Sequence, residues 1–295
     1  MSLIERAVHE RRRPATATPA IGARPPSVGN LIRPRVQTPP GQRSEISNTP
    51  VVPADRCIEL DLKQLAASSH LVPRNLRSPL AREISAIKRA LEPSITDARE
   101  GRPEGPLVVA VTSTNPREGK SFLSLNLGFF YLFSEVRPVL LVDMDTIACG
   151  LSRSLGVADR SGLADRVPEQ LQQIGDCLLQ TRREPLSILP AGKLPASAVD
   201  WTRRDCQQMV SMARKMAPPN GVIIIDTAPL TALPTAHLLC DYVDRALFVV
   251  GAGQTTPDQI ALALAQIGNQ QAVRFVLNRA SIASTAAEYR YKPGG

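Results

Sequence analysis

Continuous runs of apolar and β-branched residues alternate with helix-forming segments along most of the chain. The runs are 107–113, 138–145, 186–192, 221–229, 245–253 and 272–279, and helical periodicity occurs at 119–134, 201–216 and 257–267. Runs without polar alternation are typical of parallel strands that are buried on both faces. The alternation of such strands with helices predicts an α/β fold, with a mainly parallel sheet covered by helices on both faces.

Two shorter helical patterns precede the first of these strands, at 58–69 and 78–91. In the second pattern, Ser78 occupies a cap position and Pro79 the first turn, which is how many helices begin. Its apolar residues fall on one face, and they are Leu80, Ile84, Ile87 and Leu91. We therefore expect an amphipathic helix there, within an N-terminal helical region over 57–100.

The first 56 residues differ in composition from the rest. They hold nine arginines, nine prolines and four acidic residues, with few apolar positions. Such a segment cannot bury enough surface to offset its ordering entropy, so we expect 1–56 to be basic and disordered. It would serve either as a solvated tether or as a segment that binds anionic lipid through its positive charge. The absence of interleaved aromatic residues argues against nucleic acid as a partner.

The overall composition is that of a globular protein. With 295 residues, of which 43% are hydrophobic and 21% charged, the chain can bury a substantial core. Its five cysteines form no CxxC pair, which argues against a zinc or iron–sulfur site and favours a reducing compartment. No apolar run approaches the ~18–20 residues of a transmembrane helix. Charges also stand where a signal peptide would have its apolar core, so we expect a cytoplasmic protein.

The segment between the first long strand and the next helix, TNPREGKS (114–121), matches the end of the phosphate-binding loop pattern. In such a loop, backbone N–H groups surround phosphate oxygens, a lysine contacts the terminal phosphates and a hydroxyl ligates Mg²⁺. Lys120 and Ser121 match those two side chains. A surface turn that only caps the helix is the alternative. The predicted nucleotide contacts are Thr114, Asn115, Pro116, Arg117, Glu118, Gly119, Lys120, Ser121 and Phe122.

Three aspartates follow buried strands. Asp143 and Asp145 come at the end of PVLLVDMD, and Asp226 ends GVIIID. The carboxyl ends of parallel strands meet at one edge of the sheet, and burying three carboxylates there costs too much unless a cation shares them. Mg²⁺ held with a nucleotide would supply that cation. The alternative is that each aspartate caps the helix that follows it.

These segments resemble the Walker A, Walker A′ and Walker B motifs of the bacterial tyrosine kinases of capsular and exopolysaccharide synthesis. The later segments ILPAGKLP, VVGAGQTT and FVLNR follow the order of that family. The opening MSLIERAV and the EISAIKRAL helix are similar to its exosortase-associated autokinase branch. The resemblance implies a P-loop NTPase fold over 101–280, with ATP and Mg²⁺ as cofactors.

The resemblance also implies roles for individual residues. Lys120 and Ser121 would bind the phosphates, and Ser121 would also ligate Mg²⁺. Asp143 would assist the metal or position the attacking hydroxyl, and Asp145 would be the base for that hydroxyl. Asp226 would orient Mg²⁺ through water.

Further implications concern the adenine, the phosphoacceptors and the partner. Asn278 would touch the adenine. Tyr289 and Tyr291, in a flexible tail over 281–295, would accept phosphate from another subunit. The resemblance implies an inner-membrane chain-length determinant or co-polymerase as partner, which would hold the protein at the periphery of that membrane.

The sequence departs from the family pattern at several positions. Arg117 stands where glycine is usual, and Ile147 replaces a conventional cation after the paired aspartates. The helix motif that the family uses for ring assembly, Glu-x-x-Arg-x-x-Arg, aligns with Arg82, Ser85 and Lys88. Homo-oligomerisation is therefore left open by the sequence.

Two other functions remain open at this stage. A catalytically weak scaffold would bind nucleotide to control assembly of a polysaccharide exporter, and the departures above are consistent with it. A partitioning or division-site ATPase shares the paired aspartates, but it carries a lysine where this chain has Asn115. The expected function is an ATP-dependent protein-tyrosine autokinase that regulates polysaccharide polymerisation and export.

Overall fold

The computed structural model describes residues 53–69, 76–92, 105–167, 170–193, 201–233 and 235–280. These residues all belong to one unit of the chain, Pro50–Gly295. Nearly all of the predicted basic segment 1–56, and the tail with Tyr289 and Tyr291, lie outside the described residues. In the described part, no helix is long and apolar enough to cross a membrane.

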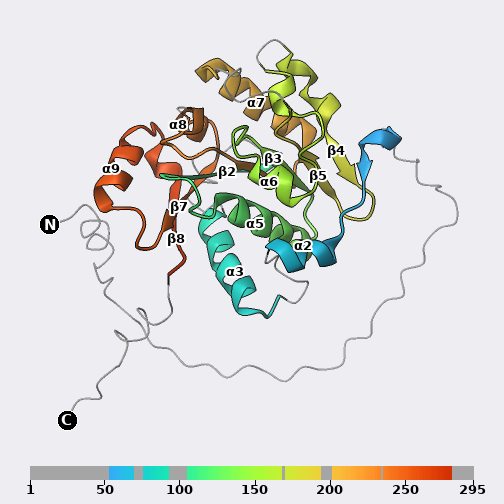
Figure 1. The fold of residues 1–295 in the computed structure, drawn as a ribbon. Coiled ribbons are helices and arrows are strands. Elements are labelled where there is room, and N and C mark those ends of the chain that lie inside the picture. Colours follow the sequence, from blue (N-terminus) through green and yellow to red (C-terminus); the bar gives the residue numbers. More distant parts are fainter. Residues whose placement is uncertain are drawn as a thin grey trace, which may run out of the picture. The chain divides into compact units, whose positions relative to one another are not determined.

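One sheet of eight strands runs through the described residues, in the order β1-β4-β5-β3-β6-β2-β7-β8 (Figure 1). Neighbouring strands are parallel, except that β4 is antiparallel to β5. The strands are β1 (Cys57–Ile58), β2 (Leu107–Ser113), β3 (Val139–Asp143), β4 (Leu179–Thr181), β5 (Leu186–Leu189), β6 (Val222–Asp226), β7 (Arg245–Gly251) and β8 (Val273–Asn278). The predicted α/β fold with a mainly parallel sheet is confirmed.

Helices cover both faces of the sheet (Figure 1). They are α2 (Leu62–Ser69), α3 (Pro79–Leu91), α5 (Lys120–Glu135), α6 (Gly150–Ser154), α7 (Arg203–Met216), α8 (Thr235–Cys240) and α9 (Pro257–Ala265). In the described residues, 3₁₀ helices accompany them at Ala54–Arg56, Leu163–Asp165, Leu171–Cys177 and Gln270–Ala272. The strands β2, β3 and β6 are buried at every position, which explains why their sequences are almost continuously apolar, whereas the edge strand β8 alternates between buried and more exposed positions.

The pleat of β2 shows how the sheet divides the core. Val109 and Val111 belong to the apolar cluster that contains residues of α3 and α5. Val108 and Ala110, at the alternate positions, belong to the cluster formed with α7 and α8. Successive side chains of a strand point to opposite faces, so one short strand stabilises both layers. The central strand β2 is thereby held firmly at the point where the phosphate-binding loop begins.

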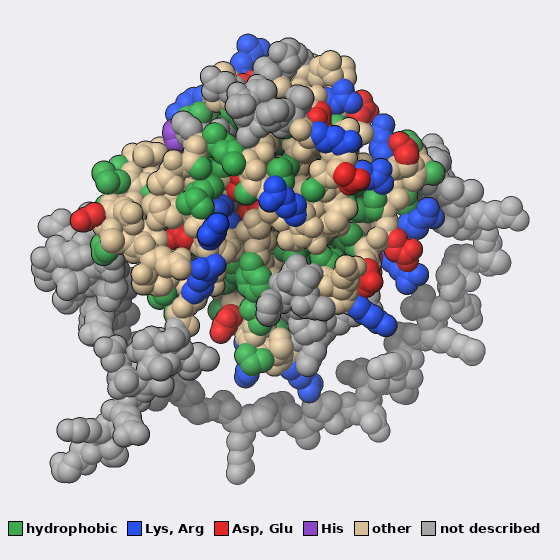
Figure 2. Space-filling model, viewed as in Figure 1, with side chains coloured by type: hydrophobic (Ala, Val, Ile, Leu, Met, Phe, Trp, Pro, Cys, Tyr) green, Lys and Arg blue, Asp and Glu red, His purple; other side chains and the backbone are tan. Residues whose placement is uncertain are grey.

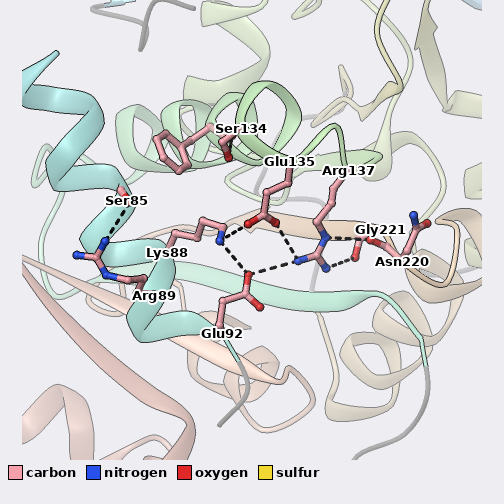
Figure 3. A network of polar contacts seen from close by, with 10 residues as sticks. Ser85, Lys88, Arg89, Glu92, Ser134, Glu135, Arg137, Asn220 and Gly221 are labelled. Carbon is pink, nitrogen blue, oxygen red and sulfur yellow. Dashed lines mark hydrogen bonds and ion pairs between the residues drawn. The ribbon is translucent and has the colours of Figure 1, made fainter. Parts of the chain in front are cut away.

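An ion-pair network joins α3 to the end of α5 (Figure 3). Lys88 contacts Glu92 at 3.6 Å and also pairs with Glu135. Arg137 contacts Glu92 at 3.3 Å and Glu135 at 3.7 Å, and its Nη2 donates to the Gly221 carbonyl at 3.2 Å. Lys88 aligns with the last arginine of the family's assembly motif. Its side chain is only 14% exposed and makes its ion pairs within the chain.

The structure corrects the sequence-based expectation for 58–69. A helix was expected over the whole segment, but Ile58 belongs to β1, which pairs in parallel with β4, and the helix begins only at Leu62. Asp61 explains this boundary, because its carboxylate accepts hydrogen bonds from the Lys63 and Gln64 amides at 2.9 and 3.1 Å. The short elements β4 and α8 were not predicted. The start of α3 was predicted correctly, since the Ser78 hydroxyl accepts from the Ala81 amide.

Candidate nucleotide-binding site

The predicted phosphate-binding loop connects β2 to α5 at the carboxyl edge of the sheet. Gly119 precedes the helix with φ +100°, a conformation that L side chains rarely adopt. A Cβ atom at Gly119 would lie 2.1 Å from Asn278 Nδ2, so the loop requires glycine there for space as well. The first turn of α5 leaves backbone N–H groups without helical partners, and these can bind anionic oxygens.

Glu118 fastens the loop to the end of β7. Its fully buried carboxylate accepts hydrogen bonds from the Asn115 amide at 2.7 Å, from the Gly251 amide at 2.9 Å and from the Thr255 hydroxyl. The Glu118 carbonyl accepts from Asn278 Nδ2 at 2.8 Å. The side chains of Glu118 and Asn278 therefore hold the loop in shape in this structure. Sequence reasoning included both residues as nucleotide contacts and missed this supporting role.

Asp226 lies beside the start of α5 and is fully buried. Its Oδ1 accepts from the Ser124 hydroxyl at 3.0 Å, whereas its Oδ2 is buried and has no hydrogen-bond partner. Burial, followed by the charge of Asp143, raises the Asp226 pKa, while Ser121 and Lys120 oppose this rise. A buried carboxylate oxygen without a donor is a costly feature that a cation would relieve.

Asp143 is the Cα neighbour of Asp226 in the register of β3 and β6. Its Oδ2 accepts from both the amide and the hydroxyl of Ser152 at 2.7 Å, and its Oδ1 accepts from the Asp145 amide at 3.2 Å. Burial raises the Asp143 pKa, although the Ser152 hydrogen bonds lower it. The carboxylate is thus held by α6 and by its own loop. Ser152 was not singled out in the sequence.

Asp145 is 3% exposed and lines a cavity at the loop. One of its oxygens, Oδ1, accepts from the Ala148 amide at 3.0 Å. This hydrogen bond closes the turn after β3 and fixes the side chain on the cavity wall. The expected convergence of Asp143, Asp145 and Asp226 at one sheet edge is present, but of these three only Asp145 lines the cavity.

The cavity measures about 580 Å³ and is strongly basic. It is lined by Pro116, Arg117, Gly119, Lys120, Ser121, Phe122, Asp145, Ile147, Ala148, Arg153, Pro229, Ala232 and Arg279. This wall carries four cationic side chains and one carboxylate, a balance that suits a polyphosphate. In Figure 2, Lys and Arg side chains stand around the centre of the face, where Figure 1 draws α6 and the start of α5. Sequence reasoning missed Arg153 and Arg279, which come from α6 and from the end of β8.

Two departures from the family pattern are visible in this cavity. Arg117 has φ +65°, so a non-glycine residue occupies a left-handed backbone position there. Ile147 is 49% exposed at the cavity wall, where the family has a cation. Arg153 lines the same wall, and no ion pair involves it within the described residues. The cavity therefore contains a cation that comes from a different position in the sequence than Ile147.

The residues present fit a nucleotide with Mg²⁺. The unpartnered Asp226 Oδ2 and the four cationic side chains that line the cavity are the observations behind this fit. Within the described ranges, no three His, Cys, Asp or Glu side chains gather into a metal cluster. Mg²⁺ at nucleotide sites usually takes one or two protein oxygens and completes its coordination with phosphates and water, so no such cluster is needed.

Comparison with curated proteins finds bacterial relatives with similar sequences. The tyrosine-protein kinase YwqD of Bacillus subtilis is 24% identical over 155 residues, which are 52% of this chain and 64% of YwqD. The tyrosine-protein kinase CpsD of Streptococcus pneumoniae serotype 4 is 27% identical over 54% of this chain and 69% of CpsD. The tyrosine-protein kinase Ptk of Acinetobacter johnsonii is 23% identical, and the match spans only 23% of its length. No family model matches the chain.

Solved structures agree with the fold. The chimerical protein CapA2B2 superposes with a TM-score of 0.56 at 19% identity, over 76% of this chain and 92% of the other. The kinase domain of the Escherichia coli tyrosine kinase ETK gives a TM-score of 0.54 at 19% identity, over 76% and 86% of the two chains. The P-loop fold expected from the motifs is confirmed by these matches. The chain is accordingly similar in sequence to bacterial tyrosine-protein kinases and has the fold of the ETK kinase domain.

Proposed function

We propose that this chain is an ATP-dependent protein-tyrosine autokinase that regulates the polymerisation and export of a capsular polysaccharide or exopolysaccharide. The observation that carries the proposal is the basic cavity at the phosphate-binding loop, in which Lys120 and Asp145 share one wall. The kinase names of YwqD and CpsD, and the name of ExoP of Rhizobium meliloti, a succinoglycan biosynthesis transport protein, support the biological setting.

ATP would bind with its phosphates at the loop and the first turn of α5. Backbone N–H groups from Gly119 onward would surround the phosphate oxygens. Lys120, which is 6% exposed, would contact the terminal phosphates from a site with little competing water. Arg153 and Arg279, which also line the cavity, would add positive charge.

Mg²⁺ would be held by the Ser121 hydroxyl together with the carboxylates at the ends of β3 and β6. Asp226 offers a free oxygen, whereas Asp143 is held by Ser152 and would act by positioning the neighbouring turn or by contacting the metal through water. When bound, Mg²⁺ neutralises the charge that develops on the phosphates during transfer.

Phosphoryl transfer needs an attacking hydroxyl in line with the leaving group, and a base near that hydroxyl. The tyrosine oxygen would form a bond to the γ-phosphorus. The bond between the γ-phosphorus and the oxygen that bridges to the β-phosphate would break, and ADP would leave. Asp145 would take the phenolic proton, because it lies on the cavity wall next to the loop. We propose Tyr289 and Tyr291 as the acceptors, supplied by a second copy of the chain.

Mass spectrometry after incubation with ATP and Mg²⁺ tests this function. The wild type should carry phosphate on Tyr289 or Tyr291, and Asp145→Asn should lose it while still binding ATP. The variant Tyr289→Phe/Tyr291→Phe should bind ATP and carry no phosphate. An unphosphorylated wild type that binds ATP would overturn the kinase assignment.

A nucleotide-binding scaffold is the second candidate, and one observation favours it. The Asp143 carboxylate already accepts three hydrogen bonds within the protein, from Asp145 and Ser152. A scaffold would bind ATP at the same cavity and use it to control assembly. The mass-spectrometric experiment separates the two, since only the kinase forms phosphotyrosine.

The proposed partner is an inner-membrane chain-length determinant or co-polymerase, which would hold this chain at the membrane periphery. The chimerical protein CapA2B2, whose name joins two parts, is consistent with a kinase domain that works with a second protein. Deleting the partner gene should move the chain from the membrane fraction to the supernatant. Retention in the membrane fraction would instead implicate the basic segment 1–56.

A further inference from the structure

A second basic hollow lies at the other end of the same sheet edge, near β1 and β4. It measures about 390 Å³, and its wall is formed by Asp55, Arg56, Arg160, Ser161, Arg166, Asp176, Cys177 and Leu179. Because β4 runs antiparallel to β5, the residues before Leu179 lie at the edge where the parallel strands end. The hollow shares no lining residue with the nucleotide cavity.

The guanidinium groups in this hollow are incompletely paired. Arg160 makes no ion pair within the part of the chain that the structure describes. Arg166 donates from Nη1 to Gln170 at 2.7 Å, and the neighbouring Cys177 thiol raises the pKa of Arg166, but the Arg166 Nε is buried and has no oxygen acceptor there. Arg56 reaches Asp176 at 3.5 Å, and the Asp176 side chain is 56% exposed. A buried donor without an acceptor is costly and calls for a ligand or another explanation.

We propose that this hollow binds a phosphate dianion. Arginine guanidinium groups present several N–H donors in a plane, which match the oxygens of a phosphate group. Three such groups converge here with the Ser161 hydroxyl against two carboxylates, so the wall keeps a net positive charge. A phosphate oxygen at Arg166 Nε would supply the missing acceptor.

The hollow is connected to the candidate nucleotide site through a series of backbone and side-chain hydrogen bonds. After Arg160 and Ser161, the chain continues to Leu163, whose amide donates to the Pro190 carbonyl at 2.9 Å. Ala191, which follows Pro190, donates from its amide to the Ser152 hydroxyl, and this hydroxyl donates to the Asp143 carboxylate. The segment that carries Arg160 is therefore tied to the segment that positions Asp143.

The same phosphate chemistry has two sources. One is free inorganic phosphate, and the other is a phosphotyrosine side chain of the tail 281–295. The second source rests on the proposed autokinase function, whereas the first does not. The hollow lies within the range of volumes that accept small ligands, so a phenyl phosphate is a reasonable occupant.

Isothermal titration calorimetry with inorganic phosphate tests the site, with the nucleotide cavity filled by saturating Mg–ADP. Arg160→Gln should weaken phosphate binding by at least about tenfold. The matched control Arg204→Gln removes an exposed arginine of α7 and should leave the affinity unchanged. Asp176→Asn removes a competing carboxylate and should tighten binding, which a folding defect would not do. Thermal unfolding checks that all three variants remain folded.

A second arm uses a peptide of residues 285–295 with and without phosphate on Tyr289 and Tyr291. If the phosphorylated peptide binds more tightly than inorganic phosphate, and Arg160→Gln abolishes this difference, the site recognises phosphotyrosine. If the phosphorylated peptide and inorganic phosphate bind with equal affinity, the site recognises the phosphate group alone. Wild-type affinity in Arg160→Gln, or an equal loss in Arg204→Gln, would overturn the proposal. The phosphate arm keeps its meaning even if the chain forms no phosphotyrosine itself.

Discussion

At the scale of single residues, the side chains of the phosphate-binding loop divide into those that face the cavity and those that hold the loop. Lys120 and Ser121 line the cavity, whereas Glu118 is turned into the protein and bonds to β7. This division separates two kinds of substitution. A change at Lys120 should affect ligand binding more than folding, and a change at Glu118 should affect both.

Replacing Lys120 by methionine keeps the length of the side chain and removes its charge. We expect at least about a tenfold loss of affinity for Mg–ATP, because charge-assisted hydrogen bonds contribute roughly 1.5–3 kcal/mol each. Titration with a fluorescent ATP analogue measures the loss. Lys215→Met, at an exposed position of α7, is the control and should bind normally. Equal affinity in both variants would contradict the placement of the phosphates.

The backbone at Arg117 gives a second prediction at this scale. Its φ of +65° favours glycine and is worst for β-branched residues. Arg117→Gly should leave the free energy of unfolding within about 1 kcal/mol of wild type, because relief of the left-handed conformation offsets the entropy of glycine. Arg117→Val should lose more than Arg117→Gly. Urea denaturation measures both, and a larger loss for glycine would contradict the backbone conformation.

At the scale of elements, the ends of β3 and β6 bring two buried carboxylates into adjacent strand positions. Burial raises the pKa of both Asp143 and Asp226. The folded protein therefore keeps protons at pH values where the unfolded chain has released them. It follows that the free energy of unfolding falls as the pH rises from the ordinary carboxyl range, near 3.8, towards neutrality.

Asp226→Asn tests this pH dependence, because asparagine has the same shape and no charge. Without nucleotide and Mg²⁺, the variant should be more stable than wild type by about 1 kcal/mol or more at about pH 8, since one pKa unit corresponds to about 1.4 kcal/mol. The difference should shrink as the pH falls. Urea denaturation in EDTA over a range of pH measures it, and a constant difference at every pH would argue against a raised pKa.

The contact between α3 and the core gives a further prediction at the element scale. Ile84 is 1% exposed and belongs to the apolar cluster that includes α5. Ile84→Ala should lower the free energy of unfolding by about 2–5 kcal/mol, through lost burial and the cavity that remains. Glu83→Ala, on the exposed side of the same helix, should change it little. If both variants unfold alike, α3 is not packed as described.

At the scale of the whole molecule, the proposed acceptors and the proposed base belong to different parts of the chain. Asp145 lies at the cavity, whereas Tyr289 and Tyr291 follow the last strand by several residues. We propose that phosphate passes between copies. A copy that lacks its base but keeps its tyrosines should then be phosphorylated by another copy.

Mixing two variants tests transfer between copies. Asp145→Asn supplies the tyrosines, and Tyr289→Phe/Tyr291→Phe supplies the active cavity. Together they should form phosphotyrosine, with an initial rate that increases faster than linearly with protein concentration, whereas neither should do so alone. Mass spectrometry of the tail peptide identifies the modified copy. Phosphotyrosine in wild type but none in the mixture would point to transfer within one copy.

The central part of this protein could be predicted from its sequence, because the signals there are local. The apolar run of β2, the loop ending in Gly119 and the apolar helix after it occupy consecutive positions. Backbone preference and burial on both faces act within each of these segments, so their pattern predicts their structure. The aspartates at the ends of β3 and β6 were found by the same logic, since parallel strands end at one edge.

The distant side chains that complete the site could be identified only from the folded arrangement of the chain. The Gly251 amide lies 133 positions from Glu118, yet the two form the hydrogen bond that fastens the loop. Arg153 and Arg279 reach the nucleotide cavity, and Arg160 and Arg166 reach the second hollow, from elements without a recognisable motif. Similarly, β4 has three residues and is held by its pairing with β1 and β5. Contacts of this kind depend on how the sheet orders its strands, and that order is set by packing of the whole chain rather than by any local pattern.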